Sequence, residues 1–315
     1  MAKSIIPTID LAPFFNKESK ESEKKETINK IKEACTEYGF FQVENHGIAT
    51  SSMRRAFEVS KTFFDFSDDV KLKFSPAPDA PLPAGYFKQP AQSEDKNEFV
   101  LMFTPGSGFN VYPTNPPHFR ETFEELFSEF AKLATLMATI ISECMGLGPN
   151  FLSEYNSDRK SDFMVNLNYF PATEDENTGI REHEDGNCFT FILQDDVGGL
   201  QVKDNTGSWI PVVPSKDKLV VNVGDVVQVL SNKKLKSATH RILRPQGKNR
   251  YSFVFFNNLT GDKWVEPLPE FTKDIGEAPK YKRFLYKEYQ ALRLKNKTHP
   301  PANPEDEIRI THYAI

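Results

Sequence analysis

Hydrophobic residues recur at helical spacing through much of the first half of the chain. Between about residues 20 and 38 they share one face, and a glycine follows at position 39. Between about residues 118 and 145 an apolar residue returns every three or four positions, at Phe119, Phe123, Leu126, Phe127, Phe130, Leu133, Met137 and Ile140. This pattern predicts two amphipathic helices, and the second should face a hydrophobic core.

The pattern changes after about residue 148, where short apolar runs alternate with turn residues. We expect strands at residues 164–170, 188–193, 199–203, 209–213, 218–223, 225–230, 240–243 and 251–256. Two earlier strands are expected at residues 6–11 and 40–45, and residues 75–92, which are rich in Pro, Ala and Gly, read as a loop. Many short strands with regularly spaced turns are typical of a β-sandwich or barrel.

The order of these elements predicts an α+β fold in which helices flank a double-stranded β-helix, or jelly roll. We divide the chain into a mainly helical N-terminal region (1–153), a jelly-roll core (154–262) and a C-terminal helix and tail (263–315). A helix is expected at residues 280–294, followed by an irregular tail at 299–315. No flexible linker separates the three parts, so we expect them to pack as one unit.

Charge and composition exclude several classes of protein. The 315 residues carry a net charge of −5, without the basic surplus that nucleic-acid binding requires. No apolar run approaches the roughly 18 residues that span a membrane. Three widely spaced cysteines and the lack of a secretory signal suggest reduced thiols and a cytoplasmic protein. The expected partner is a small molecule, and nothing in the sequence points to an obligate protein partner.

The segment at residues 181–187 carries the most specific chemistry. On an extended chain, residues i and i+2 point to the same side, so His183 and Asp185 can meet at one point. His240 is the natural third ligand, 240 − 183 = 57 residues further on. Two histidines and one carboxylate form the facial triad of non-haem Fe(II) oxygenases. Two alternatives stay open, namely a solvated turn at residues 185–187 and a zinc site.

A possible anion anchor follows ten residues after His240. Arg250 and Ser252 share one face of the predicted strand. A guanidinium beside a hydroxyl suits an organic carboxylate, which it can bind through two hydrogen bonds. If this face points toward the metal, the pair can hold the distal carboxylate of 2-oxoglutarate. The alternative is an arginine at the rim of the fold, paired with one of the many acidic residues.

Eight segments match, in order and spacing, the motifs of one known family. They are IPTIDL (6–11), YGFFQVENHG (38–47), NYFP (168–171), HED (183–185), LQDDVGGLQV (193–202), VNVGD (221–225), HR (240–241) and RYS (250–252). With them the chain resembles the plant 2-oxoglutarate/Fe(II)-dependent dioxygenases of the isopenicillin N synthase-like superfamily. The likeness runs from about Ile6 to His312 and is greatest to the hydroxylases and O-demethylases of specialised metabolism.

The resemblance assigns roles to the metal and cosubstrate residues. It implies that His183, Asp185 and His240 ligate Fe(II). It also implies that Arg250 and Ser252 bind the distal carboxylate of 2-oxoglutarate.

The resemblance further implies that Asn168 assists the cosubstrate, and that the substrate pocket is lined by Phe256, Asn258 and Asn166. Phe170 stands where the family usually has a tyrosine whose hydroxyl contacts the cosubstrate. The loss of that hydrogen bond would cost about 0.5–1.5 kcal/mol. An aromatic lining would suit a flat, apolar substrate.

The implied enzyme uses Fe(II), 2-oxoglutarate and O₂, with ascorbate as reductant, and releases succinate and CO₂. The expected reactions are hydroxylation, O- or N-demethylation, desaturation or ring closure of a small plant metabolite. Two other functions stay open, an Fe(II) oxidase that does not use 2-oxoglutarate and a non-catalytic jelly roll that binds a small ligand. Metal content and the dependence of turnover on 2-oxoglutarate distinguish these possibilities.

Overall fold

The computed structural model describes residues 5–315 except 78–79, 81–83, 156–159, 175 and 299–305. The strands of the larger sheet are β1 (Thr8–Asp10), β2 (Phe40–Glu44), β3 (Gly85–Lys88), β4 (Asn97–Phe103), β5 (Phe163–Tyr169), β7 (Phe189–Gln194), β10 (Leu219–Val223) and β12 (Arg250–Asn257). Those of the smaller sheet are β6 (Thr178–His183), β8 (Leu200–Lys203), β9 (Trp209–Pro211) and β11 (His240–Leu243). A short pair is formed by β13 (Trp264–Val265) and β14 (Phe284–Leu285). The α-helices are α1 (Ala12–Phe15), α2 (Glu21–Glu37), α3 (Thr50–Phe64), α4 (Asp68–Lys71), α5 (Phe119–Cys144), α6 (Phe151–Tyr155), α7 (Asp225–Leu230) and α8 (Tyr286–Thr298).

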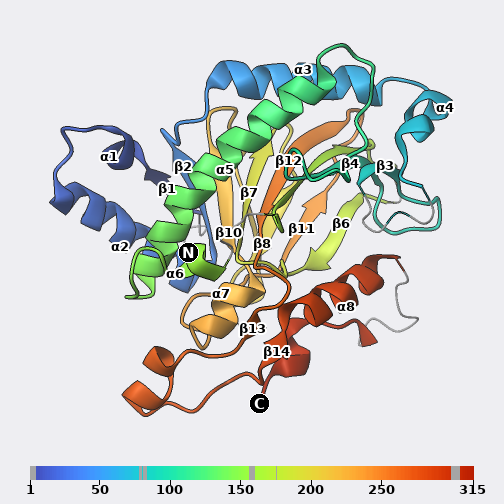
Figure 1. The fold of residues 1–315 in the computed structure, drawn as a ribbon. Coiled ribbons are helices and arrows are strands. Elements are labelled where there is room, and N and C mark those ends of the chain that lie inside the picture. The colour runs from blue at the N-terminus through green and yellow to red at the C-terminus, as the bar shows by residue number, and fades with distance from the viewer. Residues whose placement is uncertain (1–4, 78–79, 81–83, 156–159, 175, 299–305) are drawn as a thin grey trace.

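Two sheets packed face to face form the centre of the molecule, and α3 and α5 cross the outer face of the larger one (Figure 1). The larger sheet has the order β1-β2-β10-β7-β12-β5-β4-β3, and the smaller has the order β6-β11-β8-β9. Leu167 and Ile192 of the larger sheet share one buried cluster with Val202 and Ile242 of the smaller. The structure is the predicted jelly roll flanked by helices, and β1 to β4 from residues 1–153 belong to its larger sheet.

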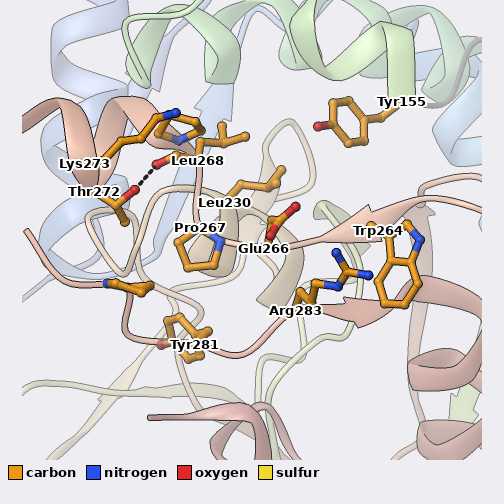
Figure 2. Close-up of a pocket in the computed structure, with 12 residues that line it drawn as sticks. Tyr155, Leu230, Trp264, Glu266, Pro267, Leu268, Thr272, Lys273, Tyr281 and Arg283 are labelled. Atoms are coloured by element: carbon orange, nitrogen blue, oxygen red, sulfur yellow. Dashed lines mark hydrogen bonds between the residues drawn. The ribbon is translucent and has the colours of Figure 1, made fainter.

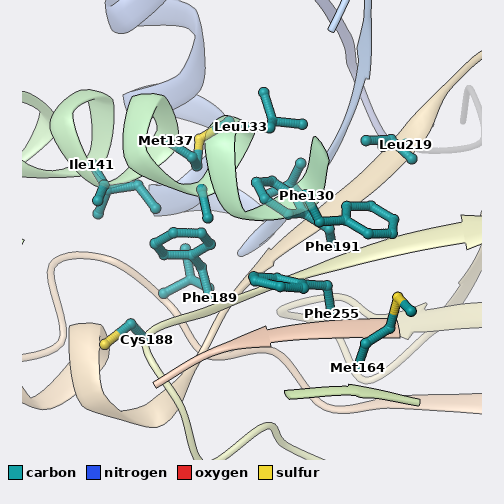
Figure 3. Close-up of a cluster of buried hydrophobic side chains, with 14 of the residues drawn as sticks. Phe130, Leu133, Met137, Ile141, Met164, Cys188, Phe189, Phe191, Leu219 and Phe255 are labelled. Atoms are coloured by element: carbon teal, nitrogen blue, oxygen red, sulfur yellow. The ribbon is translucent and has the colours of Figure 1, made fainter. Parts of the chain in front are cut away.

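The predicted apolar stripe of α5 packs on the larger sheet (Figure 3). All eight of its predicted members are buried. The ring of Phe130 stacks on Phe255 of β12 at 5.5 Å and on Phe191 of β7 at 6.1 Å, measured between ring centroids. This second hydrophobic layer lies on the opposite side of the sheet from the smaller sheet.

Most predicted elements are confirmed within a few residues, and residues 225–230 are the clearest exception. This run forms the helix α7, in which every residue is buried. The run of valines is typical of a strand, but the first two backbone amides of the helix donate hydrogen bonds to the carbonyls of residues 185 and 187. The amide of Asp225 bonds to Asp185 at 2.7 Å, and that of Val226 bonds to Asn187 at 3.1 Å.

The predicted loop at residues 75–92 is wrong in part, because Gly85–Lys88 forms β3. Its residues 78–79 and 81–83 lie outside the described part of the chain. The strands β4 and β6 were not expected from the sequence. In the C-terminal tail, residues 299–305 likewise lie outside the described residues, while 310–313 form a 3-10 helix.

Candidate metal centre

The three predicted metal ligands meet at one end of the smaller sheet. β6 and β11 are antiparallel neighbours, and His183 lies directly opposite His240 in their register. Asp185 follows two residues after the end of β6, and its Oδ1 lies 3.7 Å from Nε2 of His183 and 3.8 Å from Nε2 of His240. One ligand atom from each residue lies within 4.8 Å of the others. The fold therefore brings together residues that are far apart in the sequence.

Both imidazole rings are oriented by backbone carbonyls. Nδ1 of His183 lies 2.8 Å from the carbonyl oxygen of Arg181, and Nδ1 of His240 lies 3.1 Å from that of Ala238. A proton on each Nδ1 satisfies these carbonyls and leaves the lone pair of each Nε2 for a metal. The ring of Phe40 also packs against His240 in an edge-to-face arrangement, with 5.1 Å between the ring centroids.

The carboxylate of Asp185 is held by one oxygen and leaves the other toward the histidines. Its Oδ2 accepts hydrogen bonds from Thr190 at 2.7 Å and from Asn222 at 2.8 Å. Burial raises the pKa of Asp185, but attraction to His240 and His183 in their protonated forms and these two hydrogen bonds outweigh it, and the pKa is about 2 in the absence of a metal. An ionised carboxylate with two imidazoles is a suitable donor set for a divalent first-row metal.

Arg250 is fully buried on the face of β12 that points into the sandwich. Its Nε donates to the Gly198 carbonyl at 2.6 Å, Nη2 donates to Oε1 of Gln194 at 2.9 Å, and Nη1 lies 3.3 Å from Oγ of Ser252. Within the described part of the chain this guanidinium forms no ion pair, so it is not the paired rim arginine of the alternative interpretation. A charge that acts on it is the buried carboxylate of Asp195, which interacts with Arg250 beyond ion-pair distance. A buried cation without a carboxylate in direct contact is costly, and an organic carboxylate would provide that contact.

Asp185 and Arg250 contact the same face of β7. Thr190 bonds to Asp185, and Gln194, four residues further along that strand, bonds to Arg250. Four residues of a strand span about 13 Å. The metal centre and the buried guanidinium therefore lie along one inward face of the larger sheet, within reach of a ligand of about that length.

Tyr169 is a site residue that the sequence interpretation missed. Its ring centroid lies 4.8 Å from the guanidinium carbon of Arg250. Burial raises the pKa of the Tyr169 hydroxyl, and interactions with Arg250 and Ser252 lower it in part. Phe170, one residue later, instead contacts the ammonium group of Lys88, 5.6 Å from its ring. The phenol expected near the cosubstrate is thus present one position earlier than the motif suggested.

The structure does not support the predicted roles of Asn168 and Asn166. Both side chains lie on the helix-facing side of β5, opposite to the side of Arg250. Asn168 donates to Oε1 of Glu98 at 2.8 Å, and Asn166 accepts from Ser60 at 2.8 Å. The side-chain alternation of β5 explains this, because its odd-numbered residues, such as Tyr169, face the smaller sheet.

The two predicted pocket residues near the end of β12 lie in different places. Phe256 shares the inward face with Arg250, is partly exposed, and stacks on Phe163 with 4.6 Å between ring centroids. Asn258 is buried and accepts hydrogen bonds from Tyr286 and Gln290 of α8 at 2.7 and 3.3 Å. Asn258 therefore anchors the C-terminal helix and does not line the inward face.

A half-exposed apolar surface continues from Phe256 across the inward face of the larger sheet. Strand register and alternating burial identify its members, which are Phe87, Phe99, Leu101, Phe103, Phe163, Val165, Val254 and Phe256. We call this set the apolar wall. None of its side chains is charged, whereas the alternate residues of β4, β5 and β12 are buried on the opposite side of the sheet. The wall is an uncharged, mainly aromatic surface on the side of the larger sheet that bears Arg250.

A separate hollow of about 440 Å³ lies among the C-terminal elements (Figure 2). It is lined in part by Tyr155, Tyr281 and Trp264, and the guanidinium of Arg283 stacks on the Trp264 ring at 4.3 Å. It contains none of the residues of the metal centre, the Arg250 site or the apolar wall, and is therefore distinct from the candidate centre. No helix in the described ranges is long and apolar enough to cross a membrane.

Matches to known proteins agree with this geometry. Residues 161–259 match the 2OG-Fe(II) oxygenase superfamily, and residues 6–124 match the N-terminal region described as non-haem dioxygenase in morphine synthesis. Jasmonate-induced oxygenase 1 of Arabidopsis thaliana is 33% identical over 90% of this chain and 71% of its own length. 1-Aminocyclopropane-1-carboxylate oxidase of Musa acuminata is 31% identical over 96% of this chain and 99% of its own.

Solved structures show the same relationship. JOX2, crystallised with 2OG, Fe and JA, superimposes with a TM-score of 0.82 at 28% identity, covering 97% of this chain and 90% of JOX2. A full-length Neurospora crassa protein, crystallised with alpha-KG and 5-formyluracil, gives a TM-score of 0.80 at 27% identity, covering 92% of this chain and 95% of its own. The groups bound in these two structures favour iron over zinc. They also favour a 2-oxoglutarate-dependent enzyme over an Fe(II) oxidase that does not use 2-oxoglutarate and over a non-catalytic protein that binds a small ligand. The chain belongs to the 2OG-Fe(II) oxygenase superfamily and is a 2-oxoglutarate-, Fe(II)- and O₂-dependent dioxygenase homologous to the plant enzymes.

Proposed function

We propose that this dioxygenase oxidises a C–H bond of a small, flat and mainly apolar metabolite, by hydroxylation or by O- or N-demethylation. In this proposal His183, Asp185 and His240 ligate Fe(II). Arg250 and Ser252 bind the distal carboxylate of 2-oxoglutarate, with the Tyr169 phenol beside them. Succinate and CO₂ are the products of the cosubstrate.

The buried guanidinium of Arg250, which has no direct ion pair with any described carboxylate, carries this assignment. Arg250 bonds to the same face of β7 as Asp185, which belongs to the cluster of two histidines and one carboxylate. A dicarboxylate is the simplest ligand that satisfies both features, because one end can chelate a metal while the other neutralises Arg250. When bound, iron with 2-oxoglutarate and O₂ supplies an oxidant strong enough to break a C–H bond. The protein must orient that bond and limit the access of water.

The apolar wall supports the proposed substrate class. Its aromatic members include Phe163 and Phe256, whose rings are nearly parallel at 22°. Phe103 packs on Phe163 at 6.0 Å, and the exposed Phe109 packs on Phe103 at 6.5 Å. Flat rings bind such a surface by stacking and by burying apolar area. Two relatives hold small molecules, JA in JOX2 and 5-formyluracil in the Neurospora crassa protein.

The metal assignment is tested by measuring bound iron and succinate formation in His183→Ala, Asp185→Ala and His240→Ala. We expect each variant to lose most of its bound iron and nearly all 2-oxoglutarate-dependent succinate formation. Full iron content in any of them would remove that residue from the ligand set.

The substrate class is tested with two compound panels, one of flat aromatic methyl ethers and phenols and one of sugars and amino acids. The wild-type enzyme should form succinate faster with members of the first panel than without added substrate. Phe256→Ala should reduce that stimulation while leaving binding of 2-oxoglutarate unchanged. Stimulation only by the polar panel would contradict an apolar substrate.

A further inference from the structure

Glu184, between two proposed metal ligands, is turned away from the metal centre by side-chain alternation. Its side chain is only 15% exposed. Its Oε1 accepts a hydrogen bond from Oγ1 of Thr239, the residue immediately before His240. One carboxylate therefore connects the two chain segments that carry the ligands, from behind the metal centre.

The C-terminal segment contacts this same residue. Nη1 of Arg309 lies 4.0 Å from Oε2 of Glu184, and Arg293 of α8 donates a hydrogen bond to the Glu184 carbonyl. The side chain of Asn296 holds the backbone of Ile308 with bonds of 2.7 and 3.3 Å, which fixes the position of Arg309. Glu184 is thus bound through both its side chain and its peptide group.

Helices α7 and α8 support the backbone that follows Glu184. The Asp225 amide donates to the Asp185 carbonyl at 2.7 Å, and the Tyr289 hydroxyl donates to the Asp225 carboxylate at 2.6 Å. A β-carbon built on Gly186 would lie 3.3 Å from the Tyr289 ring, a tight contact. The backbone of residues 185–186 therefore has little room to shift on the side away from the metal centre.

We propose that Glu184 is a positioning residue that fixes the spacing between the His183–Asp185 segment and His240, and that Thr239 and Arg309 hold it in place. This inference rests on the proposed metal ligands. Glu184 itself does not contact the metal. Groups that orient metal ligands typically change metal affinity about 10–100-fold when they are removed.

The test measures binding of Co(II) alone to the metal-free full-length protein, by calorimetry and by the visible absorption of bound Co(II). The variants are Glu184→Gln, Thr239→Val and Thr239→Ser. The matched control is Glu182→Gln, because Glu182 lies in β6 two residues before Glu184, is 46% exposed, and pairs with Lys203 at 3.1 Å. We expect Glu184→Gln and Thr239→Val to weaken binding about 10-fold or more and to alter the Co(II) spectrum. Thr239→Ser, which keeps the hydroxyl, and Glu182→Gln should resemble the wild type.

The possible results separate the positioning role of Glu184 from the assignment of the metal ligands. If Glu184→Gln and Thr239→Val bind Co(II) like Glu182→Gln, the positioning role is overturned while the ligand assignment stands. If Thr239→Ser weakens binding as much as Thr239→Val, the hydroxyl contact is not responsible and the proposal is also overturned. If Glu184→Gln unfolds, the two Thr239 variants decide. If His183→Ala binds Co(II) as tightly as the wild type, the proposed ligand set itself fails.

Discussion

At the scale of single residues, Arg250 is the buried charge on which cosubstrate binding depends. It is fully buried, its guanidinium nitrogens lie against neutral oxygens of Gly198, Gln194 and Ser252, and the Tyr169 ring packs against it at 4.8 Å. These contacts orient the guanidinium without neutralising it. Its charge therefore remains available to an anionic ligand.

Replacing Arg250 with Met should weaken 2-oxoglutarate binding at least ~30-fold, or about 2 kcal/mol, because the buried carboxylate loses its charged partner. Metal affinity should change little. Anaerobic titration of the iron-loaded variant measures the effect, with Arg283→Met, an arginine on the Trp264 ring outside the site, as the control. Equal 2-oxoglutarate affinity in Arg250→Met and wild type would remove Arg250 from the cosubstrate site.

Tyr169 provides a finer test at the same site. Tyr169→Phe should raise the KM for 2-oxoglutarate about 2- to 10-fold, which corresponds to the loss of one hydrogen bond. Phe170→Tyr should leave this KM unchanged, because Phe170 contacts Lys88 instead. Steady-state kinetics of the two variants decide between the positions. The opposite pattern would show that the phenol belongs at residue 170.

Residue chemistry was predictable where spacing alone defines a face. The His183–Asp185 pair and the Arg250–Ser252 pair each lie two residues apart and each share a side, as expected. Asn168 was misplaced because a motif shows that a residue is near the site but not which face of the strand bears its side chain. Leu167 and Tyr169, the hydrophobic residues that alternate with the asparagines of β5, were the sequence signal that its odd-numbered positions face inward.

At the scale of elements, α5 stabilises the sheet that bears the site. Phe130→Ala should lower the free energy of unfolding by about 3–5 kcal/mol, because it leaves a cavity between the helix and two strands. Urea denaturation measures this loss. Thr135→Ala, on the exposed side of the same helix, should change stability by less than about 0.5 kcal/mol. Similarly small losses of unfolding free energy in both variants would contradict the packing of α5 on the larger sheet through Phe130.

Element type was predictable for α5 because its apolar stripe extends over 26 residues. The six residues of α7 are buried on all sides, and such a run has no periodicity to separate helix from strand. Its helical state depends on carbonyls of residues 185–187, which are distant in sequence. Local pattern therefore could not specify it.

At the scale of the whole molecule, two face-to-face sheets carry the site on their inward faces, α3 and α5 cover the larger sheet, and the β13–β14 pair and α8 form the C-terminal part. The completion of the larger sheet by β3 and β4 was not predictable, since it depends on pairing between β4 and β5, some 60 residues apart in sequence. Residues from β5, β6, β7, β11 and β12, together with Asp185 just after β6, define the site. Ligands that bind it should therefore stabilise the entire fold.

Metal and cosubstrate should raise the unfolding temperature in two steps. A ligand at 100 times its Kd adds about 2.7 kcal/mol to the free energy of unfolding. Differential scanning calorimetry with Co(II), and then with Co(II) and 2-oxoglutarate, measures these steps, and a chelator should reverse both. In Asp185→Asn both steps should nearly disappear. A full shift with 2-oxoglutarate in the absence of metal would contradict a metal-chelated cosubstrate.

The most direct test of the central claim is an anaerobic titration of the iron-loaded protein with 2-oxoglutarate, followed by visible absorbance. The wild type should develop a weak metal-to-ligand charge-transfer band at saturating cosubstrate, and Arg250→Met should need far more 2-oxoglutarate to reach it. The same band should be absent from His240→Ala. Failure of iron-loaded wild-type protein to form the band would contradict the assignment of a joint iron and 2-oxoglutarate site.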